Sequence, residues 1–145
     1  MRLFLTRSRE ETVELGKAFA ASLSPGDVVA LSGNLGSGKT QFVAGVCDGL
    51  GVRHRAVSPT FILINEYEGK NIKVVHIDLY RIERPEELAE LGVEEYFTDR
   101  HICLIEWAEK ALPILPPRYR SVRIRYGGAD TEREIEIDDR ERVPA

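Results

Sequence analysis

The sequence has few features of a secreted, membrane-bound or repeat protein. It has only two cysteines, Cys47 and Cys103, which lie far apart in apolar runs and lack disulfide or zinc-site spacing. We therefore expect two buried, reduced thiols. Residues 1–6 are too short an apolar start for a signal peptide, and no apolar run approaches the length of a membrane span. Internal repeats are also absent from the sequence. These absences predict a cytoplasmic protein with no membrane contact.

The chain also lacks a dominant charge of one sign. Its formal net charge is −4, from 20 Lys and Arg against 24 Asp and Glu, so its surface as a whole is not that of a general nucleic-acid binder. The 145 residues are 43% hydrophobic and 30% charged, which is typical of a soluble globular protein. We predict one domain over residues 1–145, with a polar tail from about residue 139.

One short stretch has a specific chemical pattern. Residues 33–40, with the sequence GNLGSGKT, match the phosphate-loop pattern G-x-x-x-x-G-K-[ST] at every fixed position. The apolar run 27–32 before it indicates a buried parallel strand, and residues 41–50 after it indicate a helix that ends at Gly51. The motif requires this order of strand, glycine loop and helix.

The residue types of this loop suit a nucleoside triphosphate. Its glycines have no Cβ, so the backbone can curl around an anion and point its N–H groups at it, next to the positive end of the new helix. Lys39 would contact the β- and γ-phosphates, and the Thr40 hydroxyl would bind Mg²⁺. The predicted nucleotide-binding residues of this segment are Gly33, Asn34, Leu35, Gly36, Ser37, Gly38, Lys39, Thr40 and Gln41.

Two predicted strands end in carboxylates. Residues 61–67 and 72–79 indicate a β-hairpin, and Asp78 at its end is either a ligand for Mg²⁺ through water or a charged strand end in solvent. Residues 101–107 are an apolar strand that ends in Glu106 and Trp107, a Walker-B-like pattern in which the usual acid is Asp. Glu106 could hold Mg²⁺ through water or orient the attacking water. The pattern leaves both roles open.

Three other features allow a functional and a structural interpretation. The turn at residues 58–61 contains Thr60, whose hydroxyl could sense the γ-phosphate or simply belong to a turn. His76 is better explained as a packed or hydrogen-bonded residue than as a catalyst. Arginines 118, 120, 123 and 125 alternate opposite an acidic strand at 132–138, which favours cross-strand charge pairs over an RNA contact.

Further local patterns predict the remaining helices and a second hairpin of an α/β fold. Ser8 and Glu11 match a capping box at the start of a helix, and residues 84–92 indicate a short helix that ends at Gly92. A helical turn at 109–112 should be broken by Pro113, and Gly127 with Gly128 should close a second hairpin. We predict a three-layer fold like that of P-loop NTPases, with a mixed parallel and antiparallel sheet flanked by helices.

Four segments, in this order, resemble one family, the TsaE (YjeE) ATPase component of bacterial tRNA threonylcarbamoyladenosine synthesis. They are residues 33–40, 58–61, 76–81 and 102–107. The likeness runs over nearly the whole chain. It implies a Mg²⁺-dependent P-loop ATPase that is slow alone, acts with the TsaB–TsaD pair, and reaches adenosine 37 of tRNA only through that complex.

The resemblance also implies roles for single residues. Thr40, Asp78 and Glu106 would surround Mg²⁺, and Thr60 would be the switch hydroxyl, so Lys39, Asp78, Glu106 and Thr60 form the expected catalytic set. Arg7 matches the family segment that lies near the nucleotide base, and Arg133 matches a nucleotide-binding arginine of the family. Arg81 and Arg133 are both candidates for an arginine finger.

Two alternatives share the phosphate loop. A small-molecule kinase would need an acceptor pocket and usually an arginine-rich lid, and no obvious lid lies between Asp78 and Glu106. A non-hydrolysing, nucleotide-gated interaction module would bind ATP and its partner without releasing phosphate.

Overall fold

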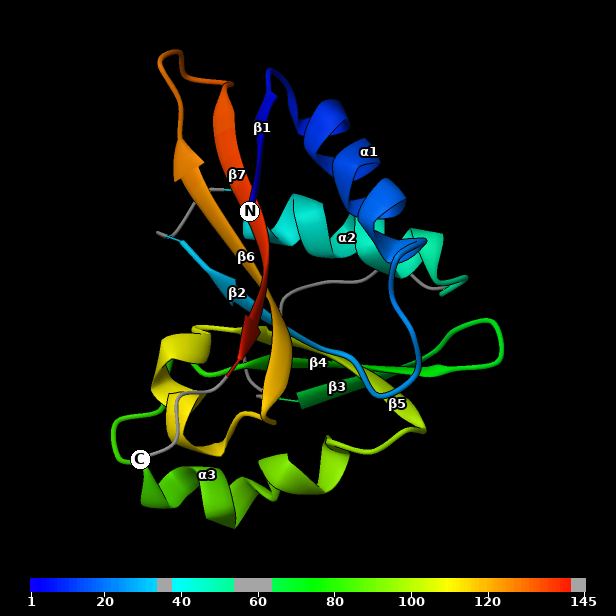
Figure 1. Ribbon diagram of the computed structural model, residues 1–145, viewed down its shortest axis with the longest axis vertical. Coiled ribbons are helices and arrows are strands. Elements are labelled where there is room, and N and C mark those ends of the chain that lie inside the picture. Colours follow the sequence, from blue (N-terminus) through cyan, green and yellow to red (C-terminus); the bar gives the residue numbers. More distant parts are fainter. Residues whose placement is uncertain (34–37, 54–63, 142–145) are drawn as a thin grey trace.

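The computed structural model describes residues 1–33, 38–53 and 64–141, with the side chains of residues 140 and 141 excluded. Seven strands and three α-helices lie within these residues (Figure 1). The strands are β1 (Arg2–Thr6), β2 (Val28–Ser32), β3 (Ile64–Glu68), β4 (Lys73–Asp78), β5 (His101–Glu106), β6 (Arg118–Tyr126) and β7 (Arg133–Glu141). The helices are α1 (Arg9–Ala20), α2 (Lys39–Gly49) and α3 (Glu86–Leu91), with two 3₁₀ helices, η1 (Val93–Tyr96) and η2 (Ala108–Ile114).

All seven strands belong to one mixed sheet in the order β1-β7-β6-β2-β5-β4-β3. Strands β6, β2, β5 and β4 run parallel to their neighbours in this central block, whereas β1, β7 and β3 pair antiparallel at the two sides. The carboxyl ends of β2, β5 and β4 therefore lie at the same edge of the sheet. In open sheets of this kind, ligands bind at that edge.

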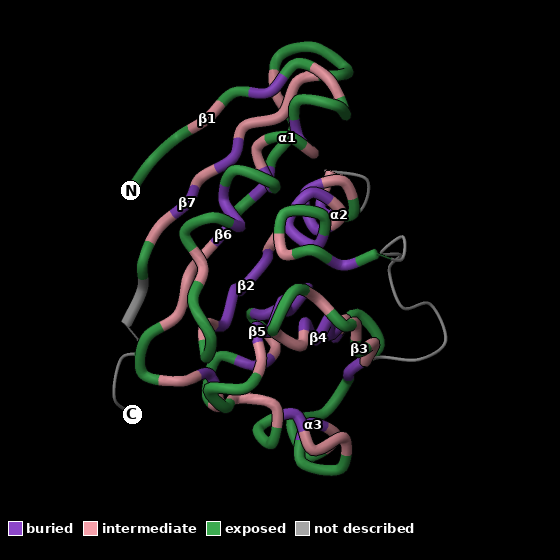
Figure 2. Tube along the Cα trace, turned by 90° about the vertical axis from the view of Figure 1, so that its right-hand side faces the viewer, coloured by how far each residue is buried: buried purple, intermediate pink, exposed green. Residues whose placement is uncertain are grey.

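Helices cover the two faces of the sheet separately (Figures 1 and 2). On one face, α1 and α2 pack over alternate strand residues that include Val29 and Leu31 of β2. On the other face, α3, η1 and η2 pack over the intervening residues, which include Val28 and Ala30. This alternation follows from the two-residue period of a strand, and it confirms the three-layer architecture predicted from the sequence.

Glycines allow α1 and α2 to pack in close contact, and this packing fixes the position of the first turn of α2. A Cβ built on Gly45 of α2 would lie only 2.0 Å from the Val13 carbonyl oxygen, and one on Gly16 of α1 only 2.3 Å from the Phe42 carbonyl oxygen. Any larger side chain at either position would push the helices apart. The start of α2, where the phosphate loop ends, is therefore held against α1.

Most predicted elements are present with slightly different bounds, and two of the expected ends are wrong. Strand β7 continues past Asp138 to Glu141 because its last residues pair with Arg118–Arg120 of β6, where a polar tail was expected. The helical turn after β5 is not broken at Pro113: η2 continues through this residue to Ile114. Both hairpins form in the described residues, and Ser8 is the N-cap of α1, where its Oγ accepts a hydrogen bond from the Glu11 N–H at 3.1 Å.

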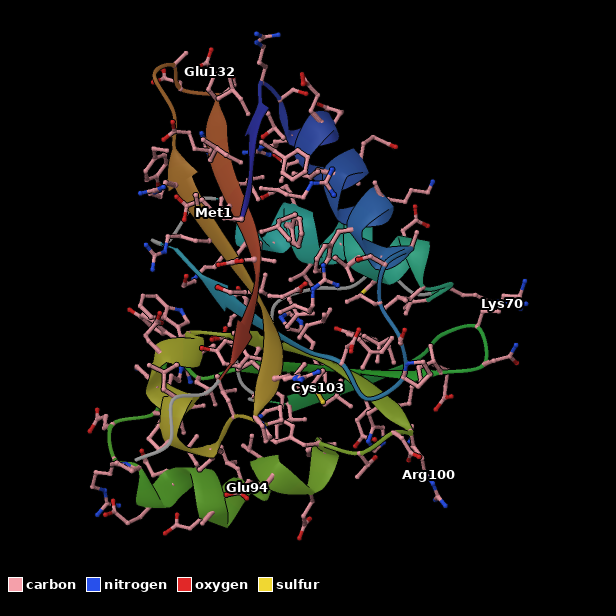
Figure 3. All side chains as sticks on the ribbon, viewed as in Figure 1. Met1, Lys70, Glu94, Arg100, Cys103 and Glu132 are labelled. Atoms are coloured by element: carbon pink, nitrogen blue, oxygen red, sulfur yellow. The ribbon has the colours of Figure 1, made fainter. Side chains whose placement is uncertain are left out.

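The two cysteines are free and buried, as predicted. Burial raises the pKa of each thiol to about 12, which disfavours the reactive thiolate. Figure 3 shows Cys103 inside the fold, whereas the labelled charged residues Lys70, Glu94, Arg100 and Glu132 lie at the periphery. Within the described segments, no helix is both long and apolar enough to span a membrane.

The arginines of β6 form two of the predicted cross-strand pairs. Arg120 pairs with Asp139 and Arg125 with Glu136, both on β7. Arg120 also lies over the Phe19 ring of α1, with its guanidinium carbon 4.7 Å from the ring centroid. These pairs confirm the structural interpretation for Arg120 and Arg125.

Candidate nucleotide site

The end of the phosphate loop has the geometry that its glycines predict. Gly33 and Gly38 have φ values of 146° and 108°, in a region that favours glycine over residues with a side chain. Gly38 is the N-cap of α2, and its carbonyl oxygen accepts a hydrogen bond from the Phe42 N–H at 3.0 Å. Thr40 is exposed in the first turn and Gln41 is partly buried. The loop residues Asn34, Leu35, Gly36 and Ser37 lie outside the described residues.

Lys39 is a buried cation without a hydrogen-bond partner in the described part of the chain. Its side chain is only 5% exposed, and its Nζ lies 4.3 Å from the centroid of the Trp107 ring. Burial lowers the pKa of Lys39, and the nearby carboxylates of Glu106, Asp78 and Glu109 partly oppose this shift. An unpartnered buried ammonium is costly, so this position fits an anionic ligand such as a phosphate group.

The two predicted acids lie side by side. Strands β4 and β5 are parallel neighbours, and their register pairs Asp78 with Glu106. Asp78 Oδ1 accepts a hydrogen bond from the Tyr80 N–H at 2.9 Å, while Glu106 is only 4% exposed. Partial burial raises the pKa of Asp78, and the neighbouring charge of Glu106 adds to this effect. The sheet thus brings both carboxylates near Lys39.

The structure adds a contact that the sequence did not reveal. His76 Nε2 lies 2.6 Å from Glu106 Oε2, and both side chains are buried. His76 was expected to be packed or hydrogen-bonded, which is confirmed, but its partner follows only from the register of β4 and β5. The available signal was the two-residue spacing between His76 and Asp78, which places them on one face of the strand.

Trp107 connects the ends of β4 and β5. It has a φ of 59°, which is unusual for a residue other than glycine, and its ring lies 5.2 Å from the Tyr80 ring, centroid to centroid. Lys110 Nζ donates hydrogen bonds to the carbonyl oxygens of Tyr80, at 2.7 Å, and Ile82, at 2.9 Å. These contacts hold the segment after β4 against the start of η2. They therefore help to fix the positions of Asp78 and Glu106 relative to each other.

On the other side of the loop, Arg133 lies against Gly38. A Cβ built on Gly38 would be 3.8 Å from Arg133 Cγ and 3.8 Å from Thr12 Cγ2. The Arg133 guanidinium donates to the carbonyl oxygens of Asp130 and Glu132, both at 2.7 Å, and stacks on Tyr126. The structure therefore brings Arg133 to the loop.

The corner between β1 and α1 also reaches this side of the loop. A hydrogen bond of 2.8 Å joins the Oγ1 atoms of Thr6 and Thr12, and both residues are buried. Arg7, which follows Thr6, is exposed at this corner. Thr60 and the rest of residues 58–61 lie outside the described residues.

The donor set fits Mg²⁺ better than a metal held by protein alone. Among the described residues, no group of three or more His, Cys, Asp or Glu side chains could hold a metal ion. Mg²⁺ usually keeps several waters and is bound by one or two carboxylates together with substrate phosphates. Asp78, Glu106 and the Thr40 hydroxyl, beside a phosphate loop, are a set of this kind.

Comparisons with known proteins agree over most of the chain. A family model described as "Threonylcarbamoyl adenosine biosynthesis protein TsaE" matches residues 6–135. The tRNA threonylcarbamoyladenosine biosynthesis protein TsaE of Bacillus subtilis is 42% identical over 130 residues, covering 90% of this chain and 80% of that protein. The protein of the same name from Nostoc is 40% identical over 140 residues, with coverage of 94% and 84%. The crystal structure of Bacillus subtilis YdiB matches with a TM-score of 0.78 and 36% identity, covering 92% of this chain and 82% of that one.

Proposed function

Because the chain belongs to the TsaE family and so has a role in threonylcarbamoyladenosine biosynthesis, we propose that it is the ATP-binding and ATP-hydrolysing component of that machinery. One observation supports this most strongly. A buried ammonium without a hydrogen-bond partner among the described residues, Lys39, lies where a phosphate loop ends and close to two strand-end carboxylates. A phosphate group would supply the negative partner that the Lys39 ammonium lacks, and its metal ion would supply the positive partner for the two carboxylates.

In the proposed reaction, a water molecule attacks the γ-phosphorus in line. Its oxygen forms the new bond while the bond to the β,γ-bridging oxygen breaks and ADP leaves. Lys39 and the loop N–H groups stabilise the charge on the phosphate oxygens. Mg²⁺ would neutralise part of the charge on the phosphates. Thr40, Asp78 and Glu106 are the residues that would hold it, directly or through water.

Glu106 is also the best placed described residue to orient the attacking water. It ends β5 next to Asp78 and near Lys39, and it is almost fully buried. A buried carboxylate in this place can accept a proton from water or hold a metal-bound water in position. Thr60 would act as the switch hydroxyl, as the family resemblance implies.

We further propose that the protein turns over slowly alone and depends on the TsaB–TsaD pair, through which it serves tRNA in the cytoplasm. The net charge of −4 supports an indirect rather than a direct tRNA contact. The partner would complete the stabilising geometry around the γ-phosphate. Arg133 lies against Gly38, which supports its assignment to nucleotide binding, and Arg7 is assigned by the family resemblance.

The test is phosphate release from ATP by the purified protein, alone and with TsaB–TsaD, with nucleotide binding measured in parallel by calorimetry. We expect Mg²⁺-dependent binding, slow release alone and faster release in the complex. Equal fast rates with and without the partner would contradict the partner dependence. Binding without phosphate release, even in the complex, would instead favour a nucleotide-gated module. Transfer of labelled phosphate to small acceptors would favour a kinase.

A further inference from the structure

His76 is a buried polar side chain on the sheet face that carries the nucleotide loop. It is 1% exposed and lies on β4 between Val74 and Asp78, on the face covered by α1 and α2. Glu106, on the neighbouring strand β5, is similarly buried and lies on the same face. The distance of 2.6 Å between His76 Nε2 and Glu106 Oε2 is a short hydrogen bond that is shielded from water.

Packing alone does not account for this pair. Burying an imidazole and a carboxylate costs free energy that apolar side chains of similar size would avoid, and a buried polar pair often contributes little net stability. Its neighbours on this face include the apolar core residues Val74, Ile102 and Leu104 and, across β3, its register partner Asn65. A leucine at position 76 would extend this core. The presence of the histidine therefore indicates a functional role for its contact with Glu106.

The direction of the hydrogen bond follows from the partners. The Glu106 carboxylate oxygen is the acceptor, so Nε2 carries the ring proton. The other ring nitrogen, Nδ1, is buried and has no hydrogen-bond partner among the described residues. An unprotonated Nδ1 leaves only a lone pair without a partner there, whereas a proton at Nδ1 would leave an unpaired N–H. We therefore assign the tautomer with its proton on Nε2.

Glu106 has a particular need for such a contact. An acid after a Walker-B-like strand is usually Asp, and Glu has one more rotatable bond. Without a restraint, that bond would let the carboxylate take several orientations, and ordering it would cost entropy when the metal or water binds. A hydrogen bond to one carboxylate oxygen fixes the plane of the group and hence the position of the other oxygen.

We propose that His76 is a positioning residue, which holds the Glu106 carboxylate in the orientation needed at the nucleotide site. This inference rests on the proposed function. His76 does not touch the reacting atoms in this assignment: it acts through Glu106, and the backbone of β4 and β5 sets the distance between them. Losing His76 should therefore impair the metal-dependent step more than the binding of the nucleotide itself.

The first experiment observes the hydrogen bond directly, without any turnover. In ¹H–¹⁵N spectra of the histidine rings, His76 should show a downfield Nε2–H signal that exchanges slowly with water. The chain has three histidines, so H76Q assigns the signal by its disappearance. In E106A, the signal should move upfield and exchange faster. A His76 ring protonated at Nδ1, or a signal unchanged in E106A, would overturn the proposal.

The second experiment uses the reach of two amides. The nitrogen of a Gln amide can lie near the position of Nε2, whereas that of Asn lies near Nδ1. H76Q should keep the Mg²⁺ dependence of fluorescent-nucleotide binding and the partner-stimulated turnover within about threefold of wild type. H76N should lose about tenfold or more in kcat, with KM little changed, and should need more Mg²⁺ for binding.

A matched control separates positioning from packing. His101, which begins β5, contacts Tyr96 O and Thr98 and lies away from Glu106, so H101Q should leave the Mg²⁺ dependence and kcat unchanged. Thermal unfolding of each variant shows that the measured protein is folded. If H76Q and H76N lose stability equally and their folded fractions keep wild-type kcat and Mg²⁺ dependence, His76 is only a packing residue. If instead wild type binds ATP but never releases phosphate, the proposed function fails while the spectra still decide the His76–Glu106 contact.

Discussion

The two halves of the sheet use their charged residues in opposite ways. In the half formed by β2, β5 and β4, charged groups are buried at the edge where these strands end: Glu106 at the end of β5 is 4% exposed, and Lys39 at the start of α2 is 5% exposed. In the half formed by β6, β7 and β1, charges pair across strands at the surface, as Arg125 does with Glu136. Because the charged groups of the first half are buried, they depend on neighbouring protein groups to compensate their charge. Water can replace a partner in the second half.

The pKa shifts follow the same division. Burial lowers the pKa of Lys39 and raises that of Asp78, so both groups are pushed towards their neutral forms in the free protein. A site of this kind carries a cost in stability that a ligand can offset. Substitutions in the first half should therefore separate function from stability, whereas those in the second half should change both only slightly.

The largest effect should come from Glu106. We expect E106Q to lower partner-stimulated phosphate release by about 100-fold or more, because the amide can neither take a proton from water nor bind the metal strongly. At saturating Mg²⁺, nucleotide affinity should stay within about threefold, since Lys39 and the loop are unchanged. Single-turnover hydrolysis and calorimetry measure the two quantities. Wild-type release by E106Q would remove Glu106 from the reaction.

Lys39 should show the opposite signs for binding and stability. K39M should weaken ATP binding by about 10- to 100-fold, because it removes a charged hydrogen-bond donor to the phosphates. The free protein should become more stable by about 1 kcal/mol, because an unpartnered buried ammonium is removed. Urea unfolding measures the second effect. The control is K110M, which removes the hydrogen bonds to Tyr80 and Ile82 and should lower stability.

The stability difference between K39M and wild type should also depend on pH. The folded-state pKa of Lys39 is lower than 10.5, the ordinary value for a lysine. Between the two pKa values, the unfolded chain binds more protons than the folded one, so wild-type stability rises with pH relative to K39M. Urea unfolding from pH 7 to 10.5 should therefore show the advantage of K39M shrinking. A difference that stays constant over this range would show that Lys39 has no lowered pKa.

Arg133 should have a smaller effect. R133M should reduce nucleotide affinity by about three- to tenfold, the value of roughly one hydrogen bond at the rim of the site. Its guanidinium also holds the carbonyl oxygens of Asp130 and Glu132, so unfolding must be measured as well. R118M, an exposed position at the opposite end of β6 in the same hairpin, is the matched control. Equal affinities for both variants would exclude Arg133 from binding.

The smallest effect should be in the surface pairs of the second half. R125Q removes the partner of Glu136, yet the Arg125 side chain is 49% exposed and water can replace it. We expect a loss of less than about 0.5 kcal/mol in the free energy of unfolding, and none in nucleotide affinity. Adding salt should reduce even this difference. A loss above about 1 kcal/mol would show that the two halves are more alike than their burial indicates.

Much of the fold follows from local signals in the sequence. The glycines at 69, 127 and 128 mark the two hairpins, and the phosphate-loop pattern fixes the order of β2 and α2. The position of β4 beside β5 depends on contacts between distant segments, which no local pattern encodes. The same reason explains why His76 was expected to be hydrogen-bonded but its bond to Glu106 was not foreseen.

Two local predictions failed. Charged residues after Asp138 indicated a tail, but pairing with β6 extends β7 to Glu141. Pro113 indicated a helix break, but a 3₁₀ helix tolerates it in this position. In the first case, pairing with a distant strand outweighed the local preference. Lys39, Asp78 and Glu106 lie near one another, while the roles of all the predicted site residues remain predictions.

Trp107 gives the protein an optical property of its own. It is the single tryptophan of the chain, and its ring lies 4.3 Å from the Lys39 ammonium. Indole emission responds to a charge at this distance, so any movement of Lys39 towards a phosphate should change both the intensity and the wavelength of the fluorescence. Binding of the proposed nucleotide should therefore be visible in unlabelled protein, in real time, from one native fluorophore.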